Sequence, residues 1–543
     1  MRRANGRFFL AVLAALAALA VLTATVSQGQ GQRGARGAAP AGAPGAAARG
    51  AAPPVAGPKP LIVDAKPVRS CESLATLALP NTTIESAAID PNNPGICRVT
   101  AITTHPPAGD KVTIWVGIPT SNWNGRFMGT GGGGFSGGSA GGVNSPVAQG
   151  YAAGATDTGH AGASGNFALG ADGKLNWQAI RDNGHVGIHE MTVTGKALTE
   201  AMYGTAPRYS YFNGCSTGGR QGLMEAQRYP QDYNGIMAGA PAINWPKLMM
   251  QSIWGSEVMN ETGNPVASCK LAAATTAAIA ACDAMDGVKD GVIEDPSRCT
   301  YDPKALIGTL AGDCGTLTQA DADVIRKIWK GPTREDGSFL WYGQSMGADL
   351  NSLAASRGTP LKPQGFNFTV DWLRYWITEN PQFDWSTMTP SMYQRFWEQS
   401  IEQYGIVIGT DNPDLTDFKS RGSKLLVWHG LADPLITADG TIDYYKRVVQ
   451  RMGGAKETSQ FMRLFLAPGV GHCSGGAGPA PTGQMEALVA WVENGNAPET
   501  LPASRPGQGT PRTRPLCQYP LVAKYKGSGS TDDAANFSCS TGF

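Results

Sequence analysis

The chain has 543 residues, and its 44 lysines and arginines nearly balance its 43 aspartates and glutamates, which gives a formal net charge of +1. This length allows about two or three domains, or one large domain with insertions. The near-neutral charge gives no sign of a nucleic-acid partner. The charged fraction of 16%, beside 71 glycines, excludes a coiled coil or helical array and favours a loop-rich fold.

Two segments precede the part of the chain that can build a core. Residues 1–27 start with Arg2 and Arg3 and continue in an apolar run, which predicts a secretory signal peptide. An uncleaved membrane anchor is the alternative, because the run is close to the shortest length that spans a bilayer, but the small residues after it favour cleavage. Residues 28–60 are rich in glycine, alanine and proline and predict a flexible linker. We therefore expect a secreted or periplasmic protein with no membrane contact after cleavage.

Residues 61–242 predict the first part of an α/β core. Residues 111–119 are the clearest strand, and a shorter strand at 126–128 leads into a glycine-rich run that extends to Gly138. The run lacks the lysine of a P-loop and the helix context of a dinucleotide-binding fingerprint. In a hydrolase such a loop supplies a backbone N–H to the oxyanion, and a plain flexible loop is the alternative.

The segment 209–228 changes from strand-forming to helix-compatible residues at a sharp turn. Residues 214–218, GCSTG, match G-x-S-x-G, in which a strand-to-helix turn exposes the hydroxyl of the serine, here Ser216, above a sheet edge. Small residues are required on both sides of the serine because the backbone is crowded there. The helix that follows directs its first N–H groups at the serine, where they stabilise an oxyanion.

Two histidines raise the possibility of a metal site. His185 and His189 stand four residues apart in a predicted helix at 182–203, so both face one side and could bind zinc, which would make the chain a metallohydrolase. The pattern H-E-x-x-H is absent, because Glu190 follows the second histidine. Half-buried histidines with other partners are therefore the better interpretation.

Residues 243–413 differ in character from the segments around them. They are rich in tryptophan, tyrosine and irregular turns, and they follow a predicted buried strand at 233–241. We interpret them as an inserted lid domain that closes over the site and supplies an aromatic wall. Inside the lid, residues 282–295 carry four aspartates spaced by Gly287 and Gly291. Calcium takes about six to eight oxygen ligands, so this loop suits calcium, although its spacing is not that of an EF-hand and a solvated acidic turn is the alternative.

Residues 414–543 predict the second part of the core and supply the partners of the serine. A buried strand at 424–428 ends in a loop that carries Asp433, and a last strand at 461–466 is followed by a loop that ends at His472. The chain order Ser216, Asp433, His472 is that of the α/β-hydrolases, in which the histidine removes the serine proton and the aspartate orients the histidine. His429 also stands at a strand end, but it precedes the aspartate and is the weaker choice of base.

The chain has ten cysteines, and an even number in an exported protein predicts disulfides. No C-x-x-C pair occurs, which excludes a zinc ribbon. Cys215 is next to Ser216 and Cys473 is next to His472, so these cysteines come within bonding distance if the serine and the histidine meet. Three further pairs are expected to bond: Cys71–Cys97, Cys282–Cys299 and Cys517–Cys539.

These segments together resemble the tannase and feruloyl esterase family of α/β-hydrolases, which includes mono(2-hydroxyethyl) terephthalate hydrolase. The resemblance extends over nearly all of residues 65–543. It rests on residues 214–219, on residues 282–291, on His429-Gly430 with Asp433, and on residues 471–473. Residues 514–517 and 525–530 also look like the bacterial members of the family.

The resemblance implies an α/β-hydrolase fold with a large inserted lid, and a disulfide Cys215–Cys473 beside the catalytic residues. It implies an oxyanion hole from the N–H of Thr217 and one N–H of the glycine run, at Gly132 or Gly133. It also implies a structural Ca²⁺ held by the side chains of three aspartates and two backbone carbonyls: Asp283, Asp286, Asp290, Val288 and Val292. Leu306 to Gly308 replace a cysteine expected in the family, so the pair Cys269–Cys314 is an expectation that the family pattern leaves open.

The expected function is that of a serine carboxylic-ester hydrolase acting on esters of aromatic acids, such as gallate or ferulate, through an acyl-enzyme and without a redox cofactor. Mono(2-hydroxyethyl) terephthalate hydrolysis is the alternative within the esterases. A non-catalytic carbohydrate-binding protein on the same fold is the alternative from another class. We expect the protein to be a monomer. We expect its binding partner to be a small aromatic ester substrate. The acyl group, the leaving alcohol and the lid aromatics that contact substrate do not follow from the sequence.

Overall fold

The structure is a computed structural model of the chain, and it describes residues 58–506 and 511–542. The signal peptide expected at 1–27 and the linker up to residue 57 lie outside the described residues. Residues Val55–Phe543 group as one compact unit, so the boundaries expected for the two core parts and for a lid domain at 243–413 stay predictions. No helix in the described part of the chain combines the length and the apolar composition that crossing a membrane requires.

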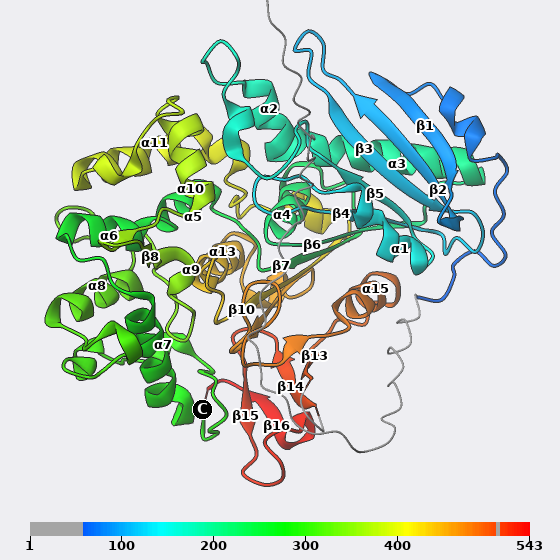
Figure 1. Cartoon of the computed structure of the whole chain (residues 1–543). Coiled ribbons are helices and arrows are strands. Elements are labelled where there is room, and N and C mark those ends of the chain that lie inside the picture. Colours follow the sequence, from blue (N-terminus) through cyan, green and yellow to red (C-terminus); the bar gives the residue numbers. More distant parts are fainter. Residues whose placement is uncertain (1–57, 507–510, 543) are drawn as a thin grey trace, which may run out of the picture. The chain divides into compact units, whose positions relative to one another are not determined.

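A nine-stranded sheet runs through the structure in the order β1-β2-β3-β5-β4-β6-β7-β10-β11 (Figure 1). The first pairs, from β1 to β5, are antiparallel, and the pairs from β5 to β11 are parallel. This mostly parallel sheet with helices confirms the predicted α/β-hydrolase fold class. Its strands are β1 (Thr82–Asp90), β2 (Asn93–Thr103), β3 (Val112–Pro119), β4 (Arg126–Thr130), β5 (Ala152–Thr156), β6 (Tyr209–Cys215), β7 (Gly235–Gly239), β10 (Lys424–Gly430) and β11 (Met462–Ala467).

Both faces of the sheet are covered by helices. Helices α3 (Gly187–Tyr203), α4 (Thr217–Arg228) and α13 (Ala438–Arg451) contribute to one apolar core, and α15 (Gln484–Asn494) contributes to another. Neighbouring strand residues alternate between the two cores: Phe212 belongs to the first and Tyr211 to the second. Such alternation is the consequence of the two-residue repeat of a strand whose faces are both buried.

The chain between β7 and β10, which we call the insertion (residues 240–423), is mostly helical and has a core of its own. That core contains several buried aromatic side chains, among them Trp372 and Trp376, and it also takes in Phe135 from the glycine-rich run after β4. The helices of the insertion are α5 (Trp245–Gln251), α6 (Trp254–Thr262), α7 (Ser268–Cys282), α8 (Gln319–Lys330), α9 (Asn351–Ala354), α10 (Asn367–Asp371), α11 (Pro390–Ile408) and α12 (Thr416–Ser420), and its two short strands are β8 (Ser356–Arg357) and β9 (Lys362–Pro363).

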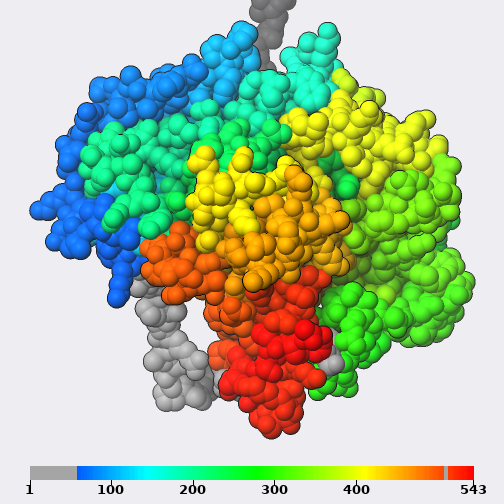
Figure 2. Space-filling model, turned by 180° about the vertical axis from the view of Figure 1, so that it is seen from behind, coloured from blue at the N-terminus to red at the C-terminus, as the bar shows by residue number. Residues whose placement is uncertain are grey.

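The C-terminal strands form two small sheets beside the insertion. In Figures 1 and 2 these strands, in orange to red, lie against the green segment that follows α7. An ion pair between Asp290 and Arg514, 2.7 Å long, joins the two segments. The elements are β12 (Ala480–Pro481), β13 (Thr500–Arg505), β14 (Arg512–Cys517), β15 (Val522–Tyr525) and β16 (Phe537–Ser540); the remaining helices of the core are α1 (Asn144–Ala148), α2 (Trp177–Arg181) and α14 (Ala455–Thr458).

All ten cysteines are paired in five disulfides, and the pairs are those expected from the sequence and from the family resemblance. They include Cys269–Cys314, the pair that the family pattern left open. The disulfides are Cys71–Cys97, Cys215–Cys473, Cys269–Cys314, Cys282–Cys299 and Cys517–Cys539.

Candidate active site

Ser216 lies at a sharp turn between the end of β6 and the start of α4. Its φ of 63° is in the left-handed region, which is unusual for a residue other than glycine and is typical of a nucleophile elbow. A Cβ atom on Gly214 would lie 2.5 Å from the carbonyl carbon of Gly218, so only glycine fits at the first position of the motif. The geometry explains why small residues are spaced around the serine.

The two other residues of the expected triad lie beside Ser216. His472 Nε2 is 2.9 Å from Ser216 Oγ, and His472 Nδ1 is 2.8 Å from Asp433 Oδ2. Ser216 follows β6, Asp433 follows β10 and His472 follows β11. The ends of parallel strands meet at one edge of a sheet, so the topology brings together three residues that are far apart in the sequence.

Asp433 is buried and held by several donors. Its Oδ1 accepts hydrogen bonds from the backbone N–H groups of Leu435, 2.9 Å, and Ile436, 3.0 Å. Burial raises the pKa of Asp433, but the hydrogen bonds from His429 and His472 outweigh it and hold the pKa well below its ordinary value. Asp433 is therefore ionised at neutral pH. A group that stabilises an imidazolium must carry this negative charge.

His429, the weaker choice of base, does not face the serine. Its Nε2 is 3.2 Å from Asp433 Oδ2, and its Nδ1 is 2.8 Å from Thr441 Oγ1. The side chain is fully buried. His429 is thus a second partner of Asp433, a role that the sequence did not indicate, because it depends on the loop folding back onto the strand end.

The glycine-rich run after β4 packs on the start of α4. The N–H of Gly218 donates to the carbonyl of Gly132, 3.0 Å, and the N–H of Gly132 donates to Gln221 Oε1, 3.0 Å. Among the described residues, the N–H groups of Thr217 and Gly133 have no hydrogen-bond partner. Of the two glycines expected to contribute to an oxyanion hole, Gly133 has the available N–H and Gly132 does not.

A cavity borders the histidine of the triad. Its volume is about 390 Å³, which is within the range that small-molecule sites occupy. Its lining includes His472 and Ser474, together with apolar side chains of the insertion such as Ile293 and Met346. A larger cavity of about 450 Å³ is lined by Asp290 and Arg514, and neither Ser216 nor His472 is in its lining. Of the two cavities, only the smaller one borders His472, although Ser216 is not in its lining.

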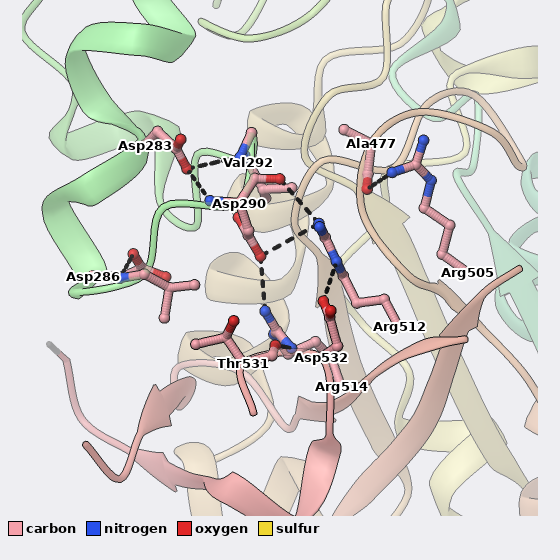
Figure 3. Close-up of polar contacts among 12 residues, drawn as sticks. Asp283, Asp286, Asp290, Val292, Ala477, Arg505, Arg512, Arg514, Thr531 and Asp532 are labelled. Carbon is pink, nitrogen blue, oxygen red and sulfur yellow. Dashed lines mark hydrogen bonds and ion pairs between the residues drawn. The ribbon is translucent and has the colours of Figure 1, made fainter. Parts of the chain in front are cut away.

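The acidic loop after α7 is the expected calcium site. Asp283 Oδ1 accepts from the backbone N–H of Asp290, 3.0 Å, and Asp286 Oδ1 accepts from that of Val288, 3.0 Å. Asp290 Oδ2 is 2.7 Å from Arg514 Nη2 (Figure 3). These contacts use one oxygen of each carboxylate, and the other oxygen of each is the type of ligand that calcium takes.

The same loop has an excess of negative charge. Burial raises the pKa of Asp286, and the neighbouring Asp290 and Asp283 raise it further. Burial and then Asp286 raise the pKa of Glu294 to about 8. The arginines of β14 offset part of this charge at Asp290 (Figure 3). The donor set and the charge both fit a cation.

The two histidines that suggested zinc have separate partners. His185 Nδ1 is 2.8 Å from the hydroxyl of Tyr229, and His189 Nδ1 is 2.6 Å from Asp232 Oδ2. The helix around them is interrupted by a π-helical turn, Asp182–Val186, before α3 begins. Within the described residues, His189 lies near two other side chains that could bind a metal, Glu225 and Asp232. His185 is not part of this group, so the two histidines do not share a metal site.

The fold and the Ser216–His472–Asp433 arrangement define an α/β-hydrolase. The family model described as "Tannase and feruloyl esterase" matches residues 97–540. The chain therefore belongs to the tannase and feruloyl esterase family, and it is a carboxylic ester hydrolase.

Named relatives agree with this assignment. A probable feruloyl esterase of Arthroderma benhamiae is 42% identical over 481 residues, which cover 86% of this chain and 87% of the relative. The mono(2-hydroxyethyl) terephthalate hydrolase of Piscinibacter sakaiensis is 32% identical over 442 residues, 67% of this chain and 69% of that protein. The crystal structure of feruloyl esterase B from Aspergillus oryzae superposes with a TM-score of 0.75 at 27% identity, over 87% of this chain and 100% of that one.

Proposed function

We propose that the protein is a secreted serine esterase that hydrolyses esters of aromatic carboxylic acids. Ser216 is the nucleophile, His472 is the general base and acid, and Asp433 orients His472. The observation that carries this proposal is the continuous hydrogen-bonded series from Ser216 Oγ through His472 to Asp433, at distances of 2.9 and 2.8 Å. Serine alone is a poor nucleophile, and this arrangement is the one that activates it.

The reaction proceeds in two acyl-transfer steps. His472 Nε2 takes the proton of Ser216 as Oγ attacks the ester carbonyl, and the charged carboxylate of Asp433 stabilises the imidazolium that forms. His472 then protonates the leaving alcohol, which departs and leaves an ester of Ser216. A water molecule repeats the sequence on this acyl-enzyme, so that the acid leaves and Ser216 regains its proton.

The tetrahedral intermediates need donors for their negatively charged oxygen. We assign the N–H of Thr217, at the first position of α4, and the N–H of Gly133, on the run that packs against it. Both belong to rigid backbone, because the run is hydrogen-bonded to α4 through Gly218 and Gln221. One such donor is worth about 3–4 kcal/mol of transition-state stabilisation.

The substrate class follows from the cavity and the relatives. Apolar residues of the insertion and of the strand ends, among them Ile293, Met346 and Leu431, line the cavity beside His472 and suit an aromatic ring. The names of the relatives, feruloyl esterase and mono(2-hydroxyethyl) terephthalate hydrolase, both denote esters of aromatic acids. We propose feruloyl or galloyl esters as the substrates. A terephthalate monoester is the second candidate substrate, and the similarity to the Piscinibacter hydrolase favours it.

We also propose a structural calcium ion in the loop after α7. The side chains of three aspartates and the carbonyls of two valines would hold it: Asp283, Asp286, Asp290, Val288 and Val292. A bound calcium ion supplies positive charge that ties these oxygens together. It has no part in the acyl transfer, for which the triad and the N–H donors suffice.

Export to the periplasm or the medium is part of the proposal. The five disulfides require an oxidising compartment, and the N-terminal sequence predicts a signal peptide. Cell fractionation with N-terminal sequencing of the mature protein tests this part. A cytoplasmic protein that keeps its first residues would refute it.

The test of the function is hydrolysis of a substrate panel by the purified, oxidised protein. The panel contains methyl ferulate, methyl gallate, mono(2-hydroxyethyl) terephthalate and p-nitrophenyl butyrate. We expect turnover of at least one aromatic ester, and its loss in Ser216→Ala. Ser459→Ala, a partly exposed serine after α14, is the matched control and is expected to keep full activity.

Each outcome of the panel distinguishes between candidate substrates or between candidate functions. The ester with the highest kcat/KM identifies the acyl group and decides between the feruloyl, galloyl and terephthalate choices. A folded protein that hydrolyses none of the four esters would contradict the proposal and favour a non-catalytic carbohydrate-binding protein. Activity that survives in Ser216→Ala would exclude Ser216 as the nucleophile.

A further inference from the structure

A second group of metal-type ligands lies far from the calcium loop, where the β2–β3 connection meets the helix that leads into α3. His105 and Asp110 come from the connection between the two strands, and Asp182 comes from the π-helical turn that precedes α3. One ligand atom from each residue lies within 4.8 Å of the other two. Figure 1 shows β3 beside α3, which is the contact that brings these residues together.

One member of the group is a fully buried carboxylate with an unused oxygen. Asp182 has no exposed surface. Its Oδ1 accepts from Gln178 Nε2, 2.7 Å, and its Oδ2 is buried without a hydrogen-bond partner among the described residues. A buried carboxylate oxygen without a donor is costly, so this atom calls for a partner that the side chains do not supply.

The charge around the group is negative. The charged groups that face His105 are three carboxylates: Asp110, Asp182 and Glu190. His105 is the basic side chain that acts most strongly on Asp110 and Asp182. A divalent cation would offset this excess.

The distances suit a small transition-metal ion. His105 Nδ1 is 2.6 Å from Asp110 Oδ2 and 3.7 Å from Asp182 Oδ1. Zinc binds nitrogen and oxygen at about 2.0–2.2 Å, so that neighbouring tetrahedral ligands lie about 3.3–3.5 Å apart. The first pair must open by about 0.7–0.9 Å and the second must close by about 0.2–0.4 Å to reach that value. The site is open to an entering ion, because the His105 side chain is 23% exposed.

Glu190 completes the arrangement. Its Oε1 lies 3.8 Å from His105 Nε2, the ring nitrogen that faces away from Asp110 and Asp182. Metal-ligating histidines usually donate their second ring N–H to a carboxylate, which fixes the tautomer and the ring orientation. His105 Nε2 is buried without a hydrogen-bond partner among the described residues, and Glu190 is the nearby carboxylate that reaches it with a small side-chain movement.

We propose that His105, Asp110 and Asp182 form a binding site for a divalent transition-metal ion such as Zn²⁺, with Glu190 as the hydrogen-bond partner of the ligating imidazole. The mixed nitrogen and oxygen donors separate this site from the all-oxygen calcium loop, because imidazole favours zinc and related ions over calcium. The ion ties the β2–β3 connection to the start of α3. It acts on stability and takes no part in the acyl transfer.

The nearest competitor is the group of His189, Glu225 and Asp232, which also meets the distance limit of 4.8 Å. That group already has a cation, because Lys196 Nζ donates to the backbone carbonyl of Asp232. Burial and the adjacent Asp232 raise the pKa of Glu225 well above its ordinary value. His189 has the same exposure and the same carboxylate contact of 2.6 Å as His105, which makes it the matched control.

Equilibrium dialysis against Zn²⁺ tests the proposal. The tag-free, oxidised protein is stripped of metal with a chelator and then kept at saturating Ca²⁺, so that the calcium loop does not compete. We expect one zinc ion per chain and a melting temperature that rises with zinc concentration. His105→Gln and Asp182→Asn are expected to weaken zinc binding about a hundredfold or more, and Glu190→Gln about tenfold.

The controls decide where the zinc binds. His189→Gln and Asp286→Asn are expected to bind zinc as the unchanged protein does. Absence of stoichiometric zinc at about 100 μM would overturn the proposal, since sites of this type bind far more tightly. Zinc that His105→Gln and Asp182→Asn both retain would overturn it too, and loss of zinc in His189→Gln would assign the ion to the competing group.

Discussion

Burial and a few directed hydrogen bonds set the orientation and the pKa of individual side chains in this protein. Asp433 shows the effect most clearly, because two histidines and two backbone N–H groups converge on one buried carboxylate. His429 and His472 both contact Oδ2 of this carboxylate, and the two backbone N–H groups hold Oδ1. Asp433 is therefore held in one orientation, and it in turn orients His472, the proposed base.

Replacing Asp433 by asparagine tests this orientation. We expect kcat for the preferred aromatic ester to fall by about 10⁴, because an amide does not stabilise the imidazolium and favours the wrong tautomer of His472. Steady-state kinetics measure the loss, and near-ultraviolet circular dichroism checks the fold. Asp443→Asn, on the partly exposed side of α13, is the control and is expected to keep its rate. A loss of less than tenfold in Asp433→Asn would remove Asp433 from the mechanism.

His185 gives a pH dependence whose sign follows from its surroundings. Burial, and then the nearby Arg228 and Arg220, lower the pKa of His185 to about 3 in the folded protein, against an ordinary value of about 6.5. Between these values the unfolded chain binds a proton that the folded protein does not, so stability falls as the pH falls. We expect this residue to contribute a loss of about 2 kcal/mol in the free energy of unfolding from pH 6 to pH 4.

Denaturant unfolding of the unchanged protein and of His185→Asn at pH 6 and pH 4 measures this contribution. Asparagine retains a polar group near the hydroxyl of Tyr229 but does not titrate. The variant is expected to lose less stability over this interval than the unchanged protein. Equal losses would show that His185 binds its proton equally well in the folded and unfolded states.

Among the elements, the glycine-rich run after β4 depends on its neighbours for its shape. Phe135, which lies in the run, stacks with Trp376 of the insertion at 5.7 Å between ring centroids. Gln221 on α4 accepts from the N–H of Gly132 and donates to the carbonyl of Gly137, 3.1 Å. The run is thus held from the insertion on one side and from the nucleophile helix on the other.

Removing the Gln221 side chain is expected to misplace the N–H of Gly133. We predict that Gln221→Ala lowers kcat about tenfold to a hundredfold and leaves KM nearly unchanged, because the donor acts mainly on the transition state. Gln221→Glu retains the acceptor for Gly132 and is expected to recover part of the rate. If KM rises while kcat stays constant, the run binds the ground state and is not the oxyanion donor.

The sequence predicted the elements whose local pattern is strong. The strand-turn-helix at Ser216 could be assigned because glycines, strand formers and helix formers follow each other within a short segment. Asp433 and His472 followed from their place after strands in the expected order. The disulfide Cys215–Cys473 followed from its neighbours in the sequence.

The rest depends on contacts that no local pattern encodes. Gln221 and His429 are unremarkable in the sequence, and only the packed fold shows that one holds the glycine run and the other holds Asp433. The contact of Arg514 with Asp290 joins residues 224 positions apart. The choice between Gly132 and Gly133 also required the structure, because it rests on which N–H is already engaged.

At the scale of the whole molecule, the acidic loop and the C-terminal strands stabilise each other, and calcium is expected to strengthen this contact. Removal of Ca²⁺ with EGTA is expected to lower the melting temperature by about 5 °C, and added Ca²⁺ is expected to restore it. Differential scanning calorimetry measures the shift. Asp286→Asn is expected to melt at the lower temperature with and without Ca²⁺. A melting temperature that EGTA does not change would refute the proposed calcium site.

The disulfide Cys215–Cys473 links the two halves of the sheet across a sequence separation of 258 residues. The chain-entropy model gives it about 5.6 kcal/mol, against about 3.5 kcal/mol for Cys71–Cys97, whose separation is 26 residues. We expect Cys215→Ala/Cys473→Ala to lower the melting temperature more than Cys71→Ala/Cys97→Ala and also to lower kcat. The second double variant is the control, because its disulfide lies far from Ser216. A larger melting-temperature loss in the control would show that native-state packing outweighs chain entropy.

The disulfides are also nested. Cys282–Cys299 lies inside the loop closed by Cys269–Cys314, which lies inside the loop closed by Cys215–Cys473. A chain that crosses a membrane from its N-terminus exposes Cys215 first and then four other cysteines before its native partner emerges. Pairing in order of appearance would join Cys215 to Cys269, and only thiol–disulfide exchange corrects that error. The disulfide beside Ser216 therefore closes only after all four cysteines inside its loop have emerged, and we expect a disulfide isomerase to speed its formation.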